Sequence, residues 1–199
     1  KIQKYIPPTA PPLGLLYLAA VLEKNKIDVS IVDSYARHLN IEQTAEEVEK
    51  LKPKIVGITC TTPTFGTAIK TAKQVKKILP NVIVVLGGPH VSPTAYDILK
   101  KFGVVDVCAL GEGEYTLLEI AQKKKLKDIK GIVFRDKKKI VRNKIRPFIE
   151  NLDELPFPSR HLIDLSLYHH VLFESYGKPL TTMITSRGCP YHCTFCGSK

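Results

Sequence analysis

The stretch that decides the fold is residues 54–110, KIVGITCTTPTFGTAIKTAKQVKKILPNVIVVLGGPHVSPTAYDILKKFGVVDVCAL. It alternates short runs rich in Val and Ile with longer amphipathic stretches. The apolar runs are 54–60, 81–87 and 104–110, and the amphipathic stretches are 64–79 and 92–102. Short apolar runs bounded by turn residues predict buried strands, and the amphipathic stretches predict helices. Strict alternation of the two predicts a parallel sheet with right-handed crossovers and helices on both faces.

The same rhythm extends on both sides of this stretch. Further helices are expected at 13–25, 41–52 and 112–125, with a strand at 27–33, and Ser92 is expected to cap the helix that follows it, with Pro93 in the first turn. The fold class is therefore α/β, a flavodoxin-like (Rossmann-like) doubly wound parallel sheet. Such a sheet needs a strand before its first helix, and only KIQKYI, residues 1–6, stands there. Either this short segment serves, or an upstream central strand is absent from the chain.

The alternation ends after residue 128. Residues 131–143 are two β-type runs around a charged turn, which predicts a hairpin, and 146–170 carries three prolines, which predicts a linker with a short helix. A last β-type run at 179–190 leads into a cluster of cysteines. We expect a ligand-binding domain over 1–128, a hairpin and linker over 129–180, and the start of another domain over 181–199.

Composition narrows the class of protein. The chain has 199 residues, is 44% hydrophobic and 25% charged, has a mean hydropathy of −0.04 and a net charge of +11. These values are typical of a soluble globular protein. Neither a signal peptide nor an apolar run of roughly 18 residues is present, which predicts a cytoplasmic protein without a membrane span. The lysines are spread along helical segments, which favours solubilising charge over a surface for RNA or another polyanion.

The loops that follow the predicted strands are the first place to look for a ligand, because open parallel sheets bind ligands beyond the carboxyl ends of their strands. These loops combine Gly, Pro and hydroxylated residues, and neither a dinucleotide fingerprint nor a phosphate-binding P-loop occurs among them. A large ligand with amide or ring substituents would suit them. The candidate binding residues are Pro12, Leu13, Gly14, Thr59, Thr61, Thr62, Gly87, Gly88, Pro89, His90, Gly111 and Glu112.

Five cysteines, an odd number, argue against a disulfide framework. Cys60 and Cys108 stand in or beside apolar runs and are expected to be buried free thiols. The other three are Cys189, Cys193 and Cys196, spaced C-x-x-x-C-x-x-C within SRGCPYHCTFC.

In the order of its motifs the chain resembles the cobalamin-binding radical S-adenosylmethionine (SAM) proteins. The resemblance rests on PPLGLLYLAAVLE, the Thr-rich loop at 59–62, GGPHVS, GEGE, LDELPFPSR and SRGCPYHCTFC. The family joins a flavodoxin-like cobalamin domain to a radical SAM barrel, of which this chain would hold only the first strand and the cluster loop. The chain alone is therefore expected to be inactive.

The resemblance implies a role for each member of the cysteine motif. Cys189, Cys193 and Cys196 would hold three irons of a [4Fe-4S] cluster and leave the fourth iron to SAM, with Phe195 near the adenine. Zinc is the alternative, since His192 lies inside the loop and could complete a Cys3His site. The family also implies a small-molecule substrate, no nucleic acid, and an electron donor such as flavodoxin or ferredoxin.

The loop before the first helix departs from that of many cobalamin proteins. They carry Asp-x-His-x-x-Gly there, with the His below the cobalt, whereas IPPTAPPLG keeps Gly14 and has neither Asp nor His. Cobalamin is thus expected to bind base-off and His-off, which suits methyl transfer to a carbon radical; His90 is expected to line the pocket. Two alternatives stay open. The domain could be a vestigial fold without cobalamin in a radical SAM enzyme of another reaction type, or the chain could be a non-catalytic binding module with a terminal zinc knuckle.

Overall fold

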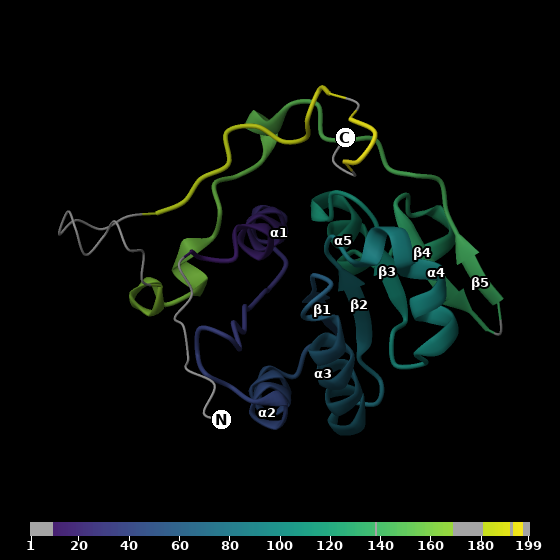
Figure 1. The fold of residues 1–199 in the computed structure, drawn as a ribbon. Coiled ribbons are helices and arrows are strands. Elements are labelled where there is room, and N and C mark those ends of the chain that lie inside the picture. Colours follow the sequence, from purple (N-terminus) through teal and green to yellow (C-terminus); the bar gives the residue numbers. More distant parts are fainter. Residues whose placement is uncertain (1–9, 138, 169–180, 192, 197–199) are drawn as a thin grey trace.

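The structure, a computed structural model, describes residues 10–137, 139–168, 181–191 and 193–196. Its centre is a five-stranded sheet with the strands in chain order (Figure 1). The strands are β1 Ile55–Thr59, β2 Ile83–Gly87, β3 Val107–Ala109, β4 Ile132–Asp136 and β5 Lys139–Arg142. The first three are parallel, and β4 and β5 each pair antiparallel with the strand before. The predicted α/β class is confirmed, and the predicted hairpin forms the end of the same sheet.

The predicted helices are confirmed with ends shifted by a few residues. They are α1 Leu13–Lys24, α2 Ile41–Leu51, α3 Phe65–Ile78, α4 Val91–Lys101 and α5 Glu114–Ala121. Short 3-10 turns follow at η1 Leu126–Asp128, η2 Leu152–Glu154, η3 Arg160–Leu162 and η4 Leu165–Leu167. Among the described residues no helix combines the length and the apolar character that crossing a bilayer requires.

The predicted cap of α4 is wrong. His90 occupies the N-cap position and makes no side-chain capping bond, and Ser92 lies inside the first turn. The Ser92 Oγ instead accepts a hydrogen bond from the Gly111 N–H at 3.1 Å. The Ser92 hydroxyl therefore ties the first turn of α4 to the loop after β3 and does not cap its own helix.

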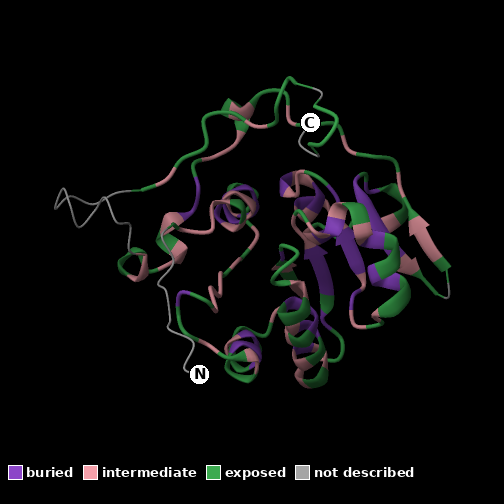
Figure 2. Cartoon of the chain, in the orientation of Figure 1, coloured by how far each residue is buried: buried purple, intermediate pink, exposed green. Residues whose placement is uncertain are grey.

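The strands β2, β3 and β4 are buried on both faces, and Figure 2 shows β2 and β3 largely in the colour of buried residues. Leu86 and Cys108 pack into a cluster with residues of α3 and α4. Val85 and Val107, which alternate with them, pack on the opposite face with Ile120 of α5. Because successive side chains of a strand point to opposite faces, the continuous Val and Ile runs of the sequence fill two cores.

Two predicted β-type segments do not form strands. Residues 27–33 and the described part of 179–190 carry no strand. A strand needs a neighbour with which to exchange backbone hydrogen bonds, and within the described sheet β1 is the outermost strand on its side. The first strand expected at 1–6 lies outside the described residues. Pattern alone therefore could not decide which apolar runs find a partner.

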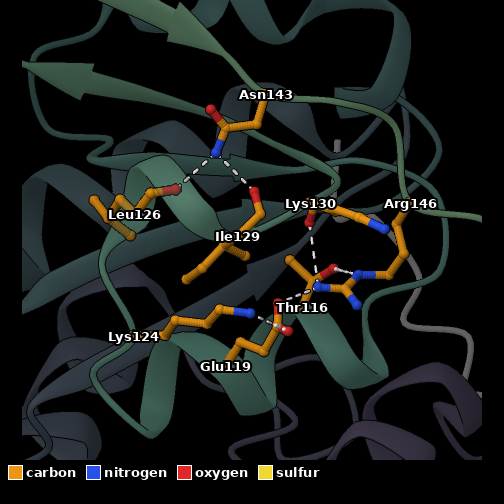
Figure 3. A network of polar contacts seen from close by, with 8 residues as sticks. All are labelled: Thr116, Glu119, Lys124, Leu126, Ile129, Lys130, Asn143 and Arg146. Carbon is orange, nitrogen blue, oxygen red and sulfur yellow. Dashed lines mark hydrogen bonds and ion pairs between the residues drawn. The ribbon is translucent and has the colours of Figure 1, made fainter.

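The exit of the hairpin is tied to α5 by a polar network (Figure 3). Asn143 donates to the carbonyls of Leu126 and Ile129 at 2.6 and 2.7 Å. Arg146 donates from Nε to Thr116 Oγ1 at 2.9 Å and from Nη2 to the Glu119 carboxylate. Thr116 is fully buried. Burial disfavours the ionised form of Glu119, yet hydrogen bonds from Lys124 and Arg146 keep the pKa of Glu119 below its usual value.

Removing this arginine should destabilise the sheet. Arg146→Met would leave the Thr116 hydroxyl without its hydrogen-bond partner, and the Glu119 carboxylate would keep only Lys124. The expected cost is about 2 kcal/mol in the free energy of unfolding. Urea unfolding measures the change. Arg142→Met, at an exposed position on β5, is the matched control and should stay within about 0.5 kcal/mol of the unaltered chain. Equal losses in the two variants would contradict the role given to Arg146.

Candidate functional site

The carboxyl ends of β1, β2 and β3 meet at one edge of the sheet. Thr59, the last residue of β1, is in register with Gly87, the last residue of β2. The Cys60 N–H donates to the Gly87 carbonyl at 3.0 Å and carries this pairing one residue into the loop. β3 pairs in parallel with β2, and the Gly111 N–H donates to Ser92 Oγ. The loops 59–66, 86–93 and 110–114 therefore form a common rim; the sequence predicted these three loops there together with the loop before α1.

Gly88 allows two of these loops to touch. Its φ is +103°, a conformation that L side chains rarely adopt. A Cβ on Gly88 would lie 2.5 Å from the Cys60 carbonyl oxygen and 2.9 Å from both Cys60 N and Thr59 Oγ1. These distances are too short for non-bonded atoms, so only glycine lets the loop after β2 lie on the end of β1.

The Thr-rich loop holds His90 in place. Thr62 Oγ1 and His90 Nδ1 are 3.1 Å apart, and the His90 ring centroid lies 4.4 Å from that of Phe65. Thr61 and Thr62 are exposed, and the Thr61 N–H donates to Thr64 Oγ1 at 2.9 Å. The loop thus offers exposed hydroxyl groups beside a fixed imidazole ring.

The third loop combines an open glycine with an engaged carboxylate. Gly111 has a φ of +67°, and a Cβ there would meet no heavy atom within 4 Å. Glu112 accepts a hydrogen bond from the Ile149 N–H at 2.6 Å and one from Arg187 Nη1 at 2.9 Å. The Gly111 backbone is therefore accessible, whereas the Glu112 carboxylate is committed to groups of the chain itself.

The middle of α1 lies beside this third loop. Pro12 is the N-cap residue, Leu13 begins the helix, and Gly14 is exposed, with open space where its Cβ would be. A Cβ on Gly113 would lie 3.1 Å from Leu18 Cδ2 of α1. Of the predicted residues, those in the loops after β1, β2 and β3 are thus brought to one rim, and α1 runs beside the last of these loops.

The three clustered cysteines are exposed at the other end of the chain. The Cys196 N–H donates to the Cys193 carbonyl at 3.2 Å, and Phe195 is 91% exposed. In the described ranges, which leave out His192, no three His, Cys, Asp or Glu side chains lie close enough together to hold a metal ion. Three soft thiolates nevertheless are the donor chemistry that an iron–sulfur cluster needs.

One group of residues at the rim was missed by sequence reasoning except for Glu112. Arg187, two residues before Cys189, pairs with Glu112 and with Glu114 and lies over the ring of Tyr17. Burial disfavours its charge, but hydrogen bonds to the two carboxylates hold the Arg187 pKa above its ordinary value. These residues are far apart in the sequence and individually ordinary, so only the fold could reveal the group.

The five thiols should react very differently with an alkylating agent. Cys60 and Cys108 are buried, as predicted, and burial raises the pKa of Cys60 and raises that of Cys108 to about 12. Because the thiolate is the nucleophile, iodoacetamide applied to the reduced, native chain should label Cys189, Cys193 and Cys196 and spare the other two. Peptide mass spectrometry reads the pattern. Labelling of all five in denaturant is the control, and native labelling of Cys108 would contradict the fold.

Comparison with known proteins places the chain in a family. The model of the B12 binding domain matches residues 4–121. An uncharacterised methyltransferase of Pyrococcus horikoshii is 38% identical over 202 residues, which cover 100% of this chain and 43% of the relative. The anaerobic magnesium-protoporphyrin IX monomethyl ester cyclase of Cereibacter sphaeroides is 29% identical over 194 residues, covering 94% of this chain and 31% of the relative.

A third relative is TokK of Streptomyces tokunonensis, described as a cobalamin-dependent radical SAM methyltransferase. It is 31% identical over 164 residues, which cover 73% of this chain and 22% of the relative. The chain thus spans less than half the length of the relatives described here.

Solved structures share the fold. OxsB, a cobalamin-dependent SAM radical enzyme with aqua-cobalamin and SAM bound, aligns with a TM-score of 0.78 at 22% identity, over 98% of this chain and 27% of OxsB. The methyltransferase TsrM of Kitasatospora setae aligns with a TM-score of 0.61 at 19% identity, over 81% of this chain and 32% of TsrM. With the family model matching more than half of its length, the chain belongs to the family of B12-binding domains, and its resemblance to the cobalamin-binding radical SAM proteins is confirmed.

Proposed function

We propose that the chain is the cobalamin-binding part of a radical SAM enzyme, most simply a methyltransferase, whose cluster is held by Cys189, Cys193 and Cys196. The observation that carries the proposal is the rim: three loops brought together at the carboxyl ends of parallel strands, with Gly88 fixing two of them. Curated relatives described as methyltransferases, one of them cobalamin-dependent, support the choice of reaction.

The residues of the rim fit a large ring ligand. Gly14 and Gly111 leave open space above the backbone, and Thr61 and Thr62 expose hydroxyl groups that can bind amide side chains of a corrin. We assign Pro12, Leu13, Thr59, Gly87, Gly88 and Pro89 to the same surface. Bound cobalamin would supply a methyl group that can be passed to a carbon atom. The chain's own part is to bind and orient the corrin.

The lower face of the cobalt would lack an imidazole from the chain. The loop IPPTAPPLG contains no histidine. This composition supports base-off, His-off binding. In such a state the electron paramagnetic resonance lines of cob(II)alamin show no splitting from an axial nitrogen, and His90→Ala leaves the spectrum unchanged.

Further assignments belong to the same proposal. The thiolates of Cys189, Cys193 and Cys196 would bind three irons of a [4Fe-4S] cluster, SAM would bind the fourth, and Phe195 would contact its adenine. A flavodoxin or ferredoxin would supply electrons, and the substrate would be a small molecule.

One reconstitution tests the proposal against its alternatives. The chain is incubated anaerobically with iron, sulfide and hydroxocobalamin, desalted, and examined by absorbance and metal analysis. Retained cobalamin together with iron–sulfur absorbance supports the proposal. Iron–sulfur absorbance without cobalamin would overturn the cobalamin assignment and leave a radical SAM protein with a vestigial domain. Stoichiometric zinc without iron uptake would instead indicate a binding module with a zinc knuckle.

A further inference from the structure

The segment 181–187, which leads into the cysteine motif, is fastened to the rest of the chain by two arginines. Arg160, in the turn η3, donates from Nε to Thr181 Oγ1 at 2.9 Å and from Nη2 to the Thr182 carbonyl at 2.6 Å. Figure 1 shows this segment in yellow, running beside the green linker that contains η3. Arg187 makes the second attachment, at the end nearer to Cys189.

The Arg187 attachment joins the cysteine motif to the rim. Arg187 Nη1 lies 2.9 Å from Glu112 Oε1, and Nη2 lies 2.8 Å from Glu114 Oε1. Glu112 follows β3 and Glu114 begins α5, so one guanidinium spans the loop after β3. The guanidinium also lies 5.1 Å from the ring centroid of Tyr17, over α1.

Burial makes these contacts strong. The Arg187 side chain is 22% exposed, and those of Glu112 and Glu114 are 14% and 6% exposed. Water screens charges poorly at such sites, and charge-assisted hydrogen bonds are stronger than neutral ones. The second oxygen of Glu112 accepts from the Ile149 N–H at 2.6 Å, so the same carboxylate also holds the linker.

We infer that Arg187 is a positioning residue that fixes the cysteine motif against the rim through Glu112 and Glu114. The attachment itself does not depend on the proposed function. Only the conclusion that it fixes a cluster relative to cobalamin rests on that function. A planar guanidinium suits two carboxylates at once, whereas an ammonium group reproduces this geometry only in part. Glu112, a residue the sequence suggested for the cofactor, would thus act by holding the chain together.

Limited proteolysis of the 199-residue chain with chymotrypsin, followed by mass spectrometry, tests the attachment. In Arg187→Gln, cleavage after residues of 181–191 such as Met183 and Tyr191 should be about 10-fold faster, while β1 to β4 stay intact. Arg187→Lys should give an intermediate rate, and Glu114→Gln should speed cleavage at the same residues. Arg142→Gln, at an exposed position, is the control and should change nothing.

Other outcomes would overturn the inference. Unchanged cleavage at 181–191 in Arg187→Gln would show that the ion pairs hold nothing in place. Faster cleavage throughout β1 to β4 would assign Arg187 to overall folding, and loss of cobalamin with unchanged cleavage would assign it to the ligand site. Failure of the proposed function is separate: the unaltered chain would then retain no cobalamin, while the cleavage pattern would still report on the attachment.

Discussion

Gly88→Val is expected to abolish retention of cobalamin and to lower the free energy of unfolding by about 3 kcal/mol. The β-branched side chain cannot adopt the φ of +103° without strain, and its Cβ would overlap the Cys60 carbonyl oxygen at 2.5 Å. The obstacle is backbone, which cannot move aside as a flexible side chain would. The loop after β2 must therefore leave the end of β1, and the rim opens. Absorbance after desalting measures cobalamin, and urea unfolding measures stability.

Substitutions at two other glycines distinguish backbone strain from steric overlap as causes of the loss in Gly88→Val. Gly103→Ala, at an exposed position where a Cβ meets no atom within 4 Å, should leave both quantities unchanged. Gly111→Ala also meets no atom, but its φ is +67°, so it should cost only about 1 kcal/mol of stability. Full cobalamin retention by Gly88→Val, with stability equal to that of Gly103→Ala, would contradict the placement of the two loops.

The sequence predicts the central strands of the fold correctly, because a run of apolar residues between turns has only one stable arrangement there. Val84, Val85 and Leu86 are buried on alternate faces of β2, and a run of apolar residues between turns is stable only when both faces are covered. Residues 27–33 have a similar pattern, yet they form no strand, because a strand also requires a partner beside it. The local pattern of apolar residues therefore predicts burial better than it predicts which segments pair as strands.

In the candidate site, too, the sequence predicts one part and misses another. Turn residues at strand ends predicted the rim, because parallel strands bring their carboxyl ends together whatever else the chain does. The pairing of Arg187 with Glu112 and Glu114 could not be predicted, since charged residues some 75 positions apart carry no signal of contact. Ser92 was misassigned for a related reason: its hydroxyl bonds Gly111, across the rim, and not its own helix.

Cys189→Ala is expected to lower the iron bound after anaerobic reconstitution by roughly 10-fold or more, with cobalamin retention unchanged. With three thiolates, a cubane cluster keeps one open iron for SAM. With two, it has two open irons and is readily lost to chelators. The rim lies on other segments of the chain, so its ligand should not respond. Iron and sulfide analysis, together with cobalamin absorbance from the same sample, measures both.

Tyr191→Phe is the matched control for this prediction. Tyr191 lies in the same motif and is 71% exposed, so removing its hydroxyl should change neither cofactor. Full iron in Cys189→Ala would show that the thiol is not a ligand. Read together, Gly88→Val should lose cobalamin and keep iron, and Cys189→Ala should do the reverse. Because each variant then loses only one cofactor, this result would indicate two independent sites. A general loss of folding would instead remove both cofactors from either variant.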